Sequence, residues 1–409
     1  MTSPVPRFTI KSRMSARDTD ESHRASSPLE ALFDLTFVVA VAQVADQLGD
    51  SIKAGESLQA IIPFIMVFFA IWWAWMNFTW FASAYDADDV PYRLLSLLQM
   101  GGVLVLAAGV PTAFVHHDFF GITLGYFIMR IGLVAQWVRA AIENPDGRAT
   151  ATRYAIGITI IQLGWVGRLL LPTDPADQWW TVYLAFAVLV VLEGVGPLWA
   201  ERTGGTSWHP HHIAERFGLF TIILLGETIA VLAGAIGAIL TAHAAFGPLV
   251  TVGVASLILI FGLWWLYFLQ PAGDGLAQKR EGSYFWGYGH YFVFAGLAAL
   301  GAGLEVVITF AGGHLVLDPV VVVYSVAIPV AVYLIALLVS HVRILPGIIV
   351  HVRIVVPTAI LVLILPLATP FVGVPVDFAA LALVVAAAVT ATLILGRRFV
   401  RAGSARSVD

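Results

Sequence analysis

The stretch "LEALFDLTFVVAVAQVADQL", Leu29 to Leu48, is apolar along most of its length but carries Glu30 and Asp34 near its start. About 20 residues at a helical rise of roughly 1.5 Å each are enough to cross the hydrocarbon core of a bilayer. The two acids are four residues apart, so they lie on one face of the first turns, where the helix dipole favours negative charge. The stretch therefore predicts a membrane-spanning helix whose acids cap it at the membrane interface.

The composition of the whole chain is that of a membrane protein. Of its 409 residues, 59% are hydrophobic and only 12% are charged, and the mean hydropathy is +0.87. With so few charges, most of the chain must face lipid or other apolar helices. The net charge of -4 is too small to indicate a nucleic-acid partner, and the lack of cysteine excludes disulfides and thiolate metal sites. We expect an all-α, polytopic integral membrane protein that contacts the lipid bilayer and has no cofactor.

Apolar segments of membrane-spanning length recur along the sequence. We count about twelve, separated by short loops, so no soluble catalytic or sensory domain is expected. The tenth and eleventh are the least distinct, because the sequence "HVRILPGIIVHVRI" between them is itself fairly apolar. The predicted spans are 29–48, 58–82, 93–114, 119–141, 152–171, 179–200, 213–240, 246–269, 284–310, 319–340, 352–371 and 376–396.

Lysine and arginine residues fall into alternate loops, which predicts the orientation of the chain. If the N-terminus is in the cytoplasm, all but three of the 22 basic residues lie on the cytoplasmic side, as the positive-inside rule requires. The three others are Lys53, Arg168 and Arg130, and Arg130 falls in mid-membrane. The polar start of the chain has no apolar core of a cleaved signal. We therefore expect a plasma-membrane protein with both termini in the cytoplasm.

An internal repeat divides the predicted spans into two halves. Segment 213–240 can be laid on segment 29–48 at an offset of 185, which matches Glu215 to Glu30. Each is followed by a span with paired tryptophans, "IWWAWMNF" in the first half and "LWWLYFLQ" in the second. An even number of helices per half makes two six-helix repeats parallel. The predicted organisation is a polar cytoplasmic tail at 1–28, six-helix halves at 29–205 and 206–396, and a basic cytoplasmic tail at 397–409.

Ionisable groups inside the predicted spans are the main candidates for function, because they are costly in a bilayer and normally face a bundle interior or water. Depth along the helices predicts that Arg130 pairs with Glu227 and that Glu305 pairs with Arg168. These groups are either structural ion pairs that lock helices together or members of a proton or ion relay. The candidate relay residues are Asp34, Arg130, Glu193, Glu227 and Glu305.

Two kinds of loop invite a metal-site interpretation. The sequence "WHPHHIAE" contains His209, His211 and His212, and a second pair stands at His116 and His117, but no nearby helix offers a matching ligand at the required spacing. The loop "YDADDV" resembles a calcium loop that lacks its glycine and its closing glutamate. We expect interfacial histidines, a solvated acidic loop and no bound metal.

Small residues at a spacing of four mark close helix contacts. Gly121 and Gly125 in "GITLG" form one such pair, and Ala295, Ala299 and Gly303 form a longer series. Small side chains let helix backbones approach closely in membranes. These stripes therefore predict packing rather than chemistry.

Two motifs together resemble the signature of the bacterial low temperature requirement A family. They are "EALFDLTFVVAVAQV" from Glu30 and "AERFGLFTIILLGETIAVL" from Ala214. The first departs from the family pattern at Ala31 and Leu32, and in the second Thr228 replaces the commoner serine but keeps its hydroxyl. The resemblance implies a bacterial integral membrane protein linked by name to growth in the cold, without a settled molecular activity. The motif positions are Glu30, Phe33, Asp34, Glu215, Arg216, Phe217, Gly218, Gly226, Glu227 and Thr228.

Two classes of function stay open. The twelve spans, the parallel halves and the buried acids favour a proton- or ion-coupled transporter, or an ion pathway, for a small ion or small molecule. Glu227, deep in its span, is the residue most expected to act. The alternative is a non-transporting membrane protein with a lipid-responsive or scaffolding role in cold growth. A membrane-embedded enzyme is a third, less favoured hypothesis: it needs an interfacial base and nucleophile, and the His-rich loop beside Glu215 is the only candidate. The Walker, HExxH and GxSxG motifs are absent, so we do not expect an enzyme. The sequence does not indicate an oligomeric state.

Overall fold

The computed structural model describes residues 10–18, 21, 25–171, 179–242, 246–345 and 349–406. These residues form helices and connecting loops, and no strand occurs among them. Ten of the twelve predicted spans each coincide with one long helix, and the other two are broken. Eleven of the helices in the described part of the chain are long and apolar enough to cross a membrane. The helix left out is α6 (Arg148–Arg168), which begins and ends with arginine. The chain is thus a polytopic all-α membrane protein, and a count of twelve spans stays a prediction.

Proline and glycine break two of the predicted spans. The third span divides at Gly109 into α3 (Val90–Ala108) and the short α4 (Val110–Val115), and Pro111 stands at the start of α4. The eleventh span is helical in α13 (Ile349–Ile364) and then passes through a 3₁₀ turn and the one-turn α14 (Thr369–Val372). Proline lacks the N–H that an inner helical turn needs, so the regular helix ends where prolines accumulate.

The chain forms two compact units. Unit 1 comprises Met1–Gln43 and Pro63–Arg216, and unit 2 comprises Val44–Ile62 and Phe217–Asp409. Three helices contribute to both units, because the divisions fall inside them: α1 (Pro28–Lys53), α2 (Ser57–Ala84) and α8 (Pro210–Ala242). The predicted halves at 29–205 and 206–396, and their parallel repeat, stay predictions.

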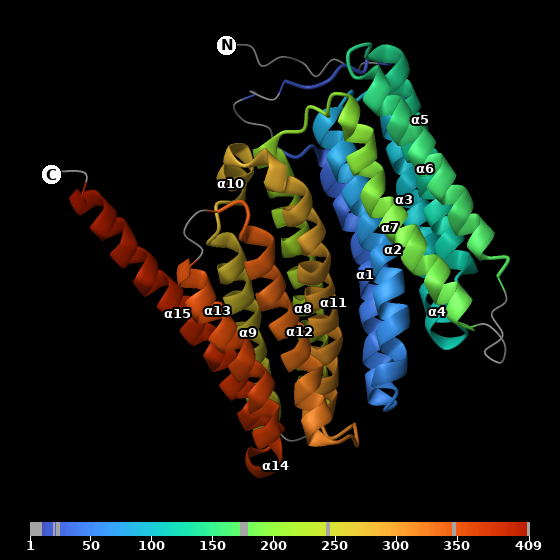
Figure 1. Cartoon of the computed structure of the whole chain (residues 1–409). Coiled ribbons are helices and arrows are strands. Elements are labelled where there is room, and N and C mark those ends of the chain that lie inside the picture. Colours follow the sequence, from blue (N-terminus) through green and yellow to red (C-terminus); the bar gives the residue numbers. More distant parts are fainter. Residues whose placement is uncertain are drawn as a thin grey trace. The chain divides into compact units, whose positions relative to one another are not determined.

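Unit 1 is built on a chain of neighbouring helices in which α3 packs against α5, α5 against α6, and α6 against α7 (Figure 1). Their bounds are Phe120–Glu143 for α5 and Trp179–Ala200 for α7. Glycine permits the closest of these contacts, because a Cβ atom on Gly125 would lie 2.3 Å from the backbone nitrogen of Leu106 in α3. A Cβ on Gly121 would likewise lie 2.8 Å from the Cα of Gly109. The close contact predicted from "GITLG" is confirmed.

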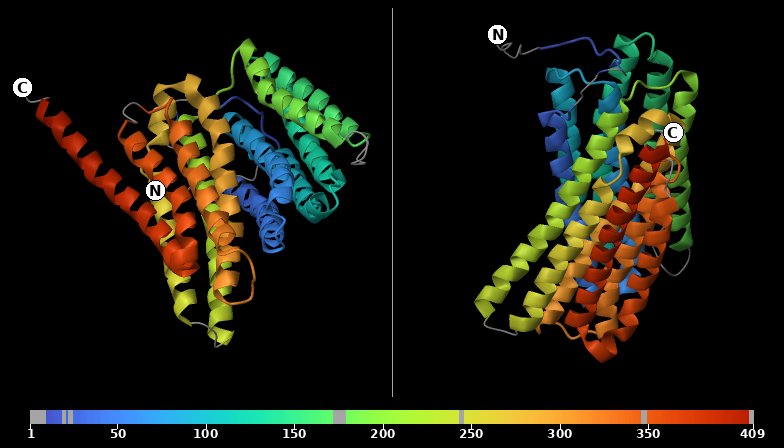
Figure 2. Two further views of the ribbon diagram at one scale, coloured as in Figure 1. Left: turned by 60° about the horizontal axis from the view of Figure 1, so that its bottom comes forward. Right: turned by 90° about the vertical axis from the view of Figure 1, so that its left-hand side faces the viewer.

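Unit 2 contains the remaining long helices, with α11 packed against α12, α15 against α9, and α12 against α13. Figures 1 and 2 both show α9, α11 and α12 as neighbours within this unit. The α11–α12 contact depends on Gly303, where a Cβ would lie 2.1 Å from the carbonyl oxygen of Ser325. The small-residue series that predicted this contact is confirmed at that position. The bounds are Phe246–Phe268 for α9, Ala272–Gln278 for α10, Ser283–Ala311 for α11, Pro319–His341 for α12 and Val374–Arg406 for α15.

Candidate functional site

A fully buried ion-pair cluster, here called the Arg216 centre, joins the first turns of α1 and α8 in unit 1. The Nε and Nη2 atoms of Arg216 donate to the two carboxylate oxygens of Asp34 at 2.9 and 2.5 Å. Its Nη1 lies 3.0 Å from Oε1 of Glu30. Arg216 and Asp34 are 0% exposed and Glu30 is 1% exposed. One guanidinium therefore contacts two carboxylates that have no access to water, and its single positive charge can offset only one negative charge.

Two further side chains complete the Arg216 centre. Trp75 Nε1 of α2 donates to Asp34 at 2.7 Å, and His212 Nε2 lies 3.2 Å from Glu30. Glu30 also takes part in a capping box with Ser27, in which each backbone N–H donates to the other residue's side chain. Glu30 therefore both caps α1 and holds α8.

Glu30 and Asp34 are both buried by the protein, and their position at the membrane interface stays a prediction. Glu30 does cap its helix, as the spacing predicted, but neither it nor Asp34 is in contact with solvent. Phe33, the motif residue between them, is also fully buried and stacks on Phe78 with ring centroids 3.9 Å apart. Arg216 offsets the cost of burying these acids, and the sequence does not show which helix supplies that guanidinium.

A second buried cluster, the Glu193 centre, lies elsewhere in unit 1. Glu193 of α7 accepts hydrogen bonds from Trp73 Nε1 at 2.6 Å, from the Tyr126 hydroxyl at 2.6 Å and from Trp165 Nε1 at 3.1 Å. Arg130 Nη2 lies 3.1 and 3.2 Å from its two oxygens and also donates to the Tyr126 hydroxyl. Four helices, α2, α5, α6 and α7, thus converge on one carboxylate.

The Glu193 centre corrects the predicted pairing of Arg130 with Glu227. Two residues at similar depth need not face each other, because depth along a helix does not fix the direction in which a side chain points. Tyr126 lies one turn before Arg130 on the same face of α5 and directs the guanidinium toward Glu193, with its ring 4.4 Å from the guanidinium carbon.

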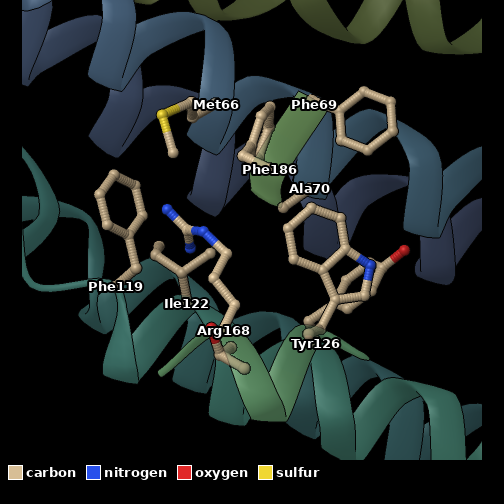
Figure 3. A pocket seen from close by; sticks show the side chains of 10 residues that line it. Met66, Phe69, Ala70, Phe119, Ile122, Tyr126, Arg168 and Phe186 are labelled. Atoms are coloured by element: carbon tan, nitrogen blue, oxygen red, sulfur yellow. The ribbon is translucent and has the colours of Figure 1, made fainter. Parts of the chain in front are cut away.

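A pocket lies directly beside the Glu193 centre and shares Tyr126 and Trp165 with it. Its volume is about 360 Å³, including the space at its mouth. Figure 3 shows the Arg168 guanidinium pointing from α6 into this space, toward Met66 and between Phe119 and Phe186. The lining residues are Met66, Phe69, Ala70, Phe119, Ile122, Thr123, Tyr126, Trp165, Arg168 and Phe186. The pocket is therefore aromatic and apolar, with one cationic group.

Unit 2 carries a row of acids along α1, α8 and α11. Lys53 Nζ lies 2.8 Å from both Asp50 and Glu305, so Glu305 pairs with Lys53 and the predicted Glu305–Arg168 pair is wrong. A Cβ on Gly49 would lie 2.9 Å from the Glu305 carboxylate, so glycine lets this side chain lie against α1. Outside that pair, Asp46 is exposed and Glu227 is half-buried.

The remaining motif positions have separate environments. Glu215 is exposed, and its carboxylate accepts a hydrogen bond from the Ser26 backbone N–H at 3.3 Å. In unit 2, Phe217 is fully buried and packs on Trp286, with ring centroids 4.6 Å apart. Gly218 is buried, Gly226 is exposed, and Thr228 donates to the Leu224 carbonyl at 3.0 Å. The repeat matches Glu215 to Glu30, but one of these acids is exposed and the other is buried.

The N-terminal strap, residues 10–18, crosses the loops that follow α2 and α5. Asp89, the N-cap of α3, accepts hydrogen bonds from the Ser12 backbone N–H at 2.8 Å and from Arg139 at 2.6 Å. Burial alone would raise the pKa of Asp89, but the bonds from Arg139, Ser12 and Tyr92 outweigh it and lower the pKa to about 2. Asp89 is 1% exposed, so the prediction of a solvated acidic loop is wrong at this position.

The histidines form no metal site in the part of the chain that the structure describes. No group of three or more His, Asp or Glu side chains there could hold a metal ion. The Nδ1 atom of His209 accepts a hydrogen bond from the backbone N–H of His212. The backbone N–H of His209 donates to the Ser83 hydroxyl. His212 is fully buried in the Arg216 centre, so it is not the interfacial side chain that the sequence predicted.

The sequence analysis missed the tryptophans that serve the two centres. Trp73 and Trp75 are two residues apart, so they point roughly 200° apart around α2. Trp73 therefore reaches Glu193 and Trp75 reaches Asp34. A signal was available, because a buried tryptophan needs an acceptor for its N–H, and an acid inside a span is a strong acceptor.

The many apolar helices of membrane-spanning length, together with two buried acid–arginine ion pairs between helices, are the features of a multi-pass integral membrane protein. Comparison with known proteins identifies the family. Residues 25–395 match the family described as Bacterial low temperature requirement A protein (LtrA), and the chain belongs to that family. It is also 28% identical over 308 residues to an uncharacterized protein of Rhizobium meliloti (strain 1021), a match that covers 70% of each chain.

Proposed function

We propose that this protein is a proton- or ion-coupled membrane transporter, or an ion pathway, in which Glu227 of α8 binds and releases the coupling ion. The observation that supports this is the state of Glu227 itself. It lies roughly 26 Å from the first residue of α8 and roughly 23 Å from the last, in the middle of a helix of membrane-spanning length. Among the described residues, no side chain pairs with its carboxylate, and Asp46 adds a like charge nearby.

The other candidate acids are saturated. Asp34 and Glu193 each accept bonds from an arginine and from tryptophan N–H groups, and Glu305 pairs with Lys53. A carboxylate held by a cationic side chain and further donors is suited to holding helices together. The structural interpretation therefore fits these three, and the relay interpretation is left to Glu227 and Asp46.

Energetics supports a wet environment for Glu227. An ionised side chain facing lipid at the centre of a bilayer costs about 3 kcal/mol even on permissive scales. Unit 2 only half-buries Glu227. The carboxyl group must therefore be either ionised and in contact with water or protonated. A group that changes between these two forms can carry a proton or attract a cation.

Flux measurements on purified protein in liposomes test the proposal. We expect an imposed ion gradient to drive proton or cation movement above that of empty vesicles, and Glu227→Gln to abolish it. Glu215→Gln is the matched control, because it removes an exposed acid from the same helix and should leave flux unchanged. If the native protein shows no flux above empty vesicles, the proposal is refuted and the non-transporting alternative, a lipid-responsive or scaffolding role in cold growth, takes its place.

We also propose that the chain lies in the plasma membrane with both termini in the cytoplasm. Within unit 1, the N-terminal strap binds the loops after α2 and α5, which are the loops that the basic residues assign to the cytoplasm. The lack of cysteine makes labelling direct. In intact cells, a membrane-impermeant thiol reagent should label Glu56→Cys, between α1 and α2, and should not label Asp146→Cys, between α5 and α6. The reverse result would invert the topology.

A further inference from the structure

We propose that the pocket at Arg168 binds an organic anion, with the anionic oxygens on the Arg168 guanidinium and an apolar body against the aromatic walls. This inference concerns unit 1 alone and does not rest on ion coupling through Glu227. It starts from a charge imbalance. Arg168 and Arg130 bring two guanidinium groups to this corner of the unit, while Glu193 is the one carboxylate there among the residues that the structure describes.

Arg168 is nine-tenths buried without a counter-ion. Only 6% of its surface is exposed. Its Nε donates to the carbonyl oxygen of Val182 at 3.2 Å, but the buried Nη2 has no hydrogen-bond partner, and no carboxylate among the described residues pairs with it. Leaving a buried arginine without a counter-ion is unfavourable, so the unused donor favours an anion in the pocket.

The surroundings of Arg168 hold its guanidinium in a fixed position, as in a preformed anion-binding site. The rings of Phe119 and Phe186 lie 4.8 and 5.6 Å from the guanidinium carbon, and they hold the group between them. A guanidinium fixed in this way presents a planar fork, which matches the two oxygens of a carboxylate or phosphate. The fork points into the pocket (Figure 3).

The walls indicate what else the ligand must carry. Beyond Arg168, the pocket is lined by apolar side chains such as Met66, Phe69 and Ile122. A bare inorganic anion would leave these walls uncovered, whereas an aromatic or short aliphatic body would bury them. The ligand class is thus a small amphipathic anion, supplied either as a free solute or as the headgroup of an anionic lipid.

Benzoate and its neutral analogue benzamide distinguish charge recognition from general apolar binding. With the whole protein in phosphatidylcholine nanodiscs, benzoate should change the tryptophan fluorescence, because Trp165 lines the pocket. We expect benzamide to bind at least tenfold more weakly. This comparison uses the native chain, so it does not depend on whether a variant folds. Equal binding of the two compounds, or binding of neither, would overturn the proposal.

Variants of two arginines on α6 locate the site. Arg168→Gln should weaken benzoate binding at least tenfold. Arg153→Gln is the matched control, because Arg153 also lies on α6 and over an aromatic ring, that of Trp199 at 5.2 Å, but outside the pocket. It should bind benzoate as the native protein does. An unchanged affinity in Arg168→Gln would place the site elsewhere and refute the assignment.

Two further arms identify what occupies the site in the membrane. Nanodiscs that contain phosphatidylglycerol should weaken benzoate binding if a lipid headgroup is the natural occupant, and should leave it unchanged if the occupant is a free solute; both results are consistent with an anion site. The sequence places Asp174 and Asp177 shortly after Arg168, outside the described residues. If benzoate binds only after both are changed to Asn, Arg168 has an internal counter-ion and the proposal is wrong.

Discussion

Removing the guanidinium from the Arg216 centre should produce the largest loss of stability among single substitutions in unit 1. Arg216→Gln leaves Glu30 and Asp34 without their cation while both stay buried, at 1% and 0% exposure. Breaking a buried ion pair on one side costs about 3 to 5 kcal/mol, because the partner charge is left uncompensated. Two carboxylates are affected, but Trp75 and His212 still contact them, so we expect a loss within that range.

Unfolding of purified protein in mixed micelles, followed by tryptophan fluorescence, gives the free energy of unfolding for this comparison. Arg93→Gln is the control, because Arg93 pairs with Asp88 where the two side chains are 44% and 50% exposed. Exposed pairs contribute about 0 to 1 kcal/mol. If Arg216→Gln costs no more than Arg93→Gln, the reasoning from buried charge is refuted.

A triple variant separates orphaned charge from lost packing. Glu30→Gln, Asp34→Asn and Arg216→Gln together remove every formal charge that the ion pairs of the Arg216 centre contain, apart from His212. Replacing a buried ion pair by neutral groups is often far less harmful than removing one partner. We expect the triple variant to recover at least half of the stability that Arg216→Gln loses. A triple variant as unstable as the single one would assign the loss to packing.

Two further predictions concern the strap and the helix contacts of unit 1. Because folding lowers the pKa of Asp89 to about 2 from an ordinary 3.8, its stabilising contribution of roughly 2 kcal/mol should be complete above about pH 4 and lost as the pH falls toward 2. Stability measured against pH should lack this step in Asp89→Asn, and identical profiles would contradict the assignment. Gly125→Ala should cost about 1 to 3 kcal/mol, because the new Cβ would lie 2.3 Å from the Leu106 nitrogen. Gly101→Ala, which meets no atom within 4 Å, should be neutral, and equal effects would refute the close-contact argument.

The positions of the helices could be predicted because membrane-length apolar runs are a local property of the sequence. The first span was predicted at 29–48, and α1 covers Pro28–Lys53. The breaks at Gly109 and before Thr369 follow local rules for proline and glycine, although the twelve predicted spans did not include them. Ionisable residues inside the spans were also identified from the sequence, since any such residue stands out against an apolar background.

The partners of those residues could not be predicted, and the reason is geometric. Each buried charge needs an opposite charge or strong donors, but a sequence gives the depth of a residue and not the neighbour that its side chain faces. Arg130 was expected to pair with Glu227 and instead pairs with Glu193, while Glu305 pairs with Lys53. These errors share one cause, because both assignments used height in the membrane as the only criterion.

The amino-acid sequence alone is enough to identify a multi-pass helical membrane protein, its family, and the few residues that carry charge inside the helices. Hydrophobic length and composition suffice for that, because the bilayer acts on every helix separately. The packing of the helices shows that Asp34 and Glu193 are held by arginines and tryptophans, that Glu227 has no paired side chain among the described residues, and that Arg168 points into an aromatic pocket. Those facts depend on helices brought together from distant parts of the chain, and the direction of each helix face is set by packing.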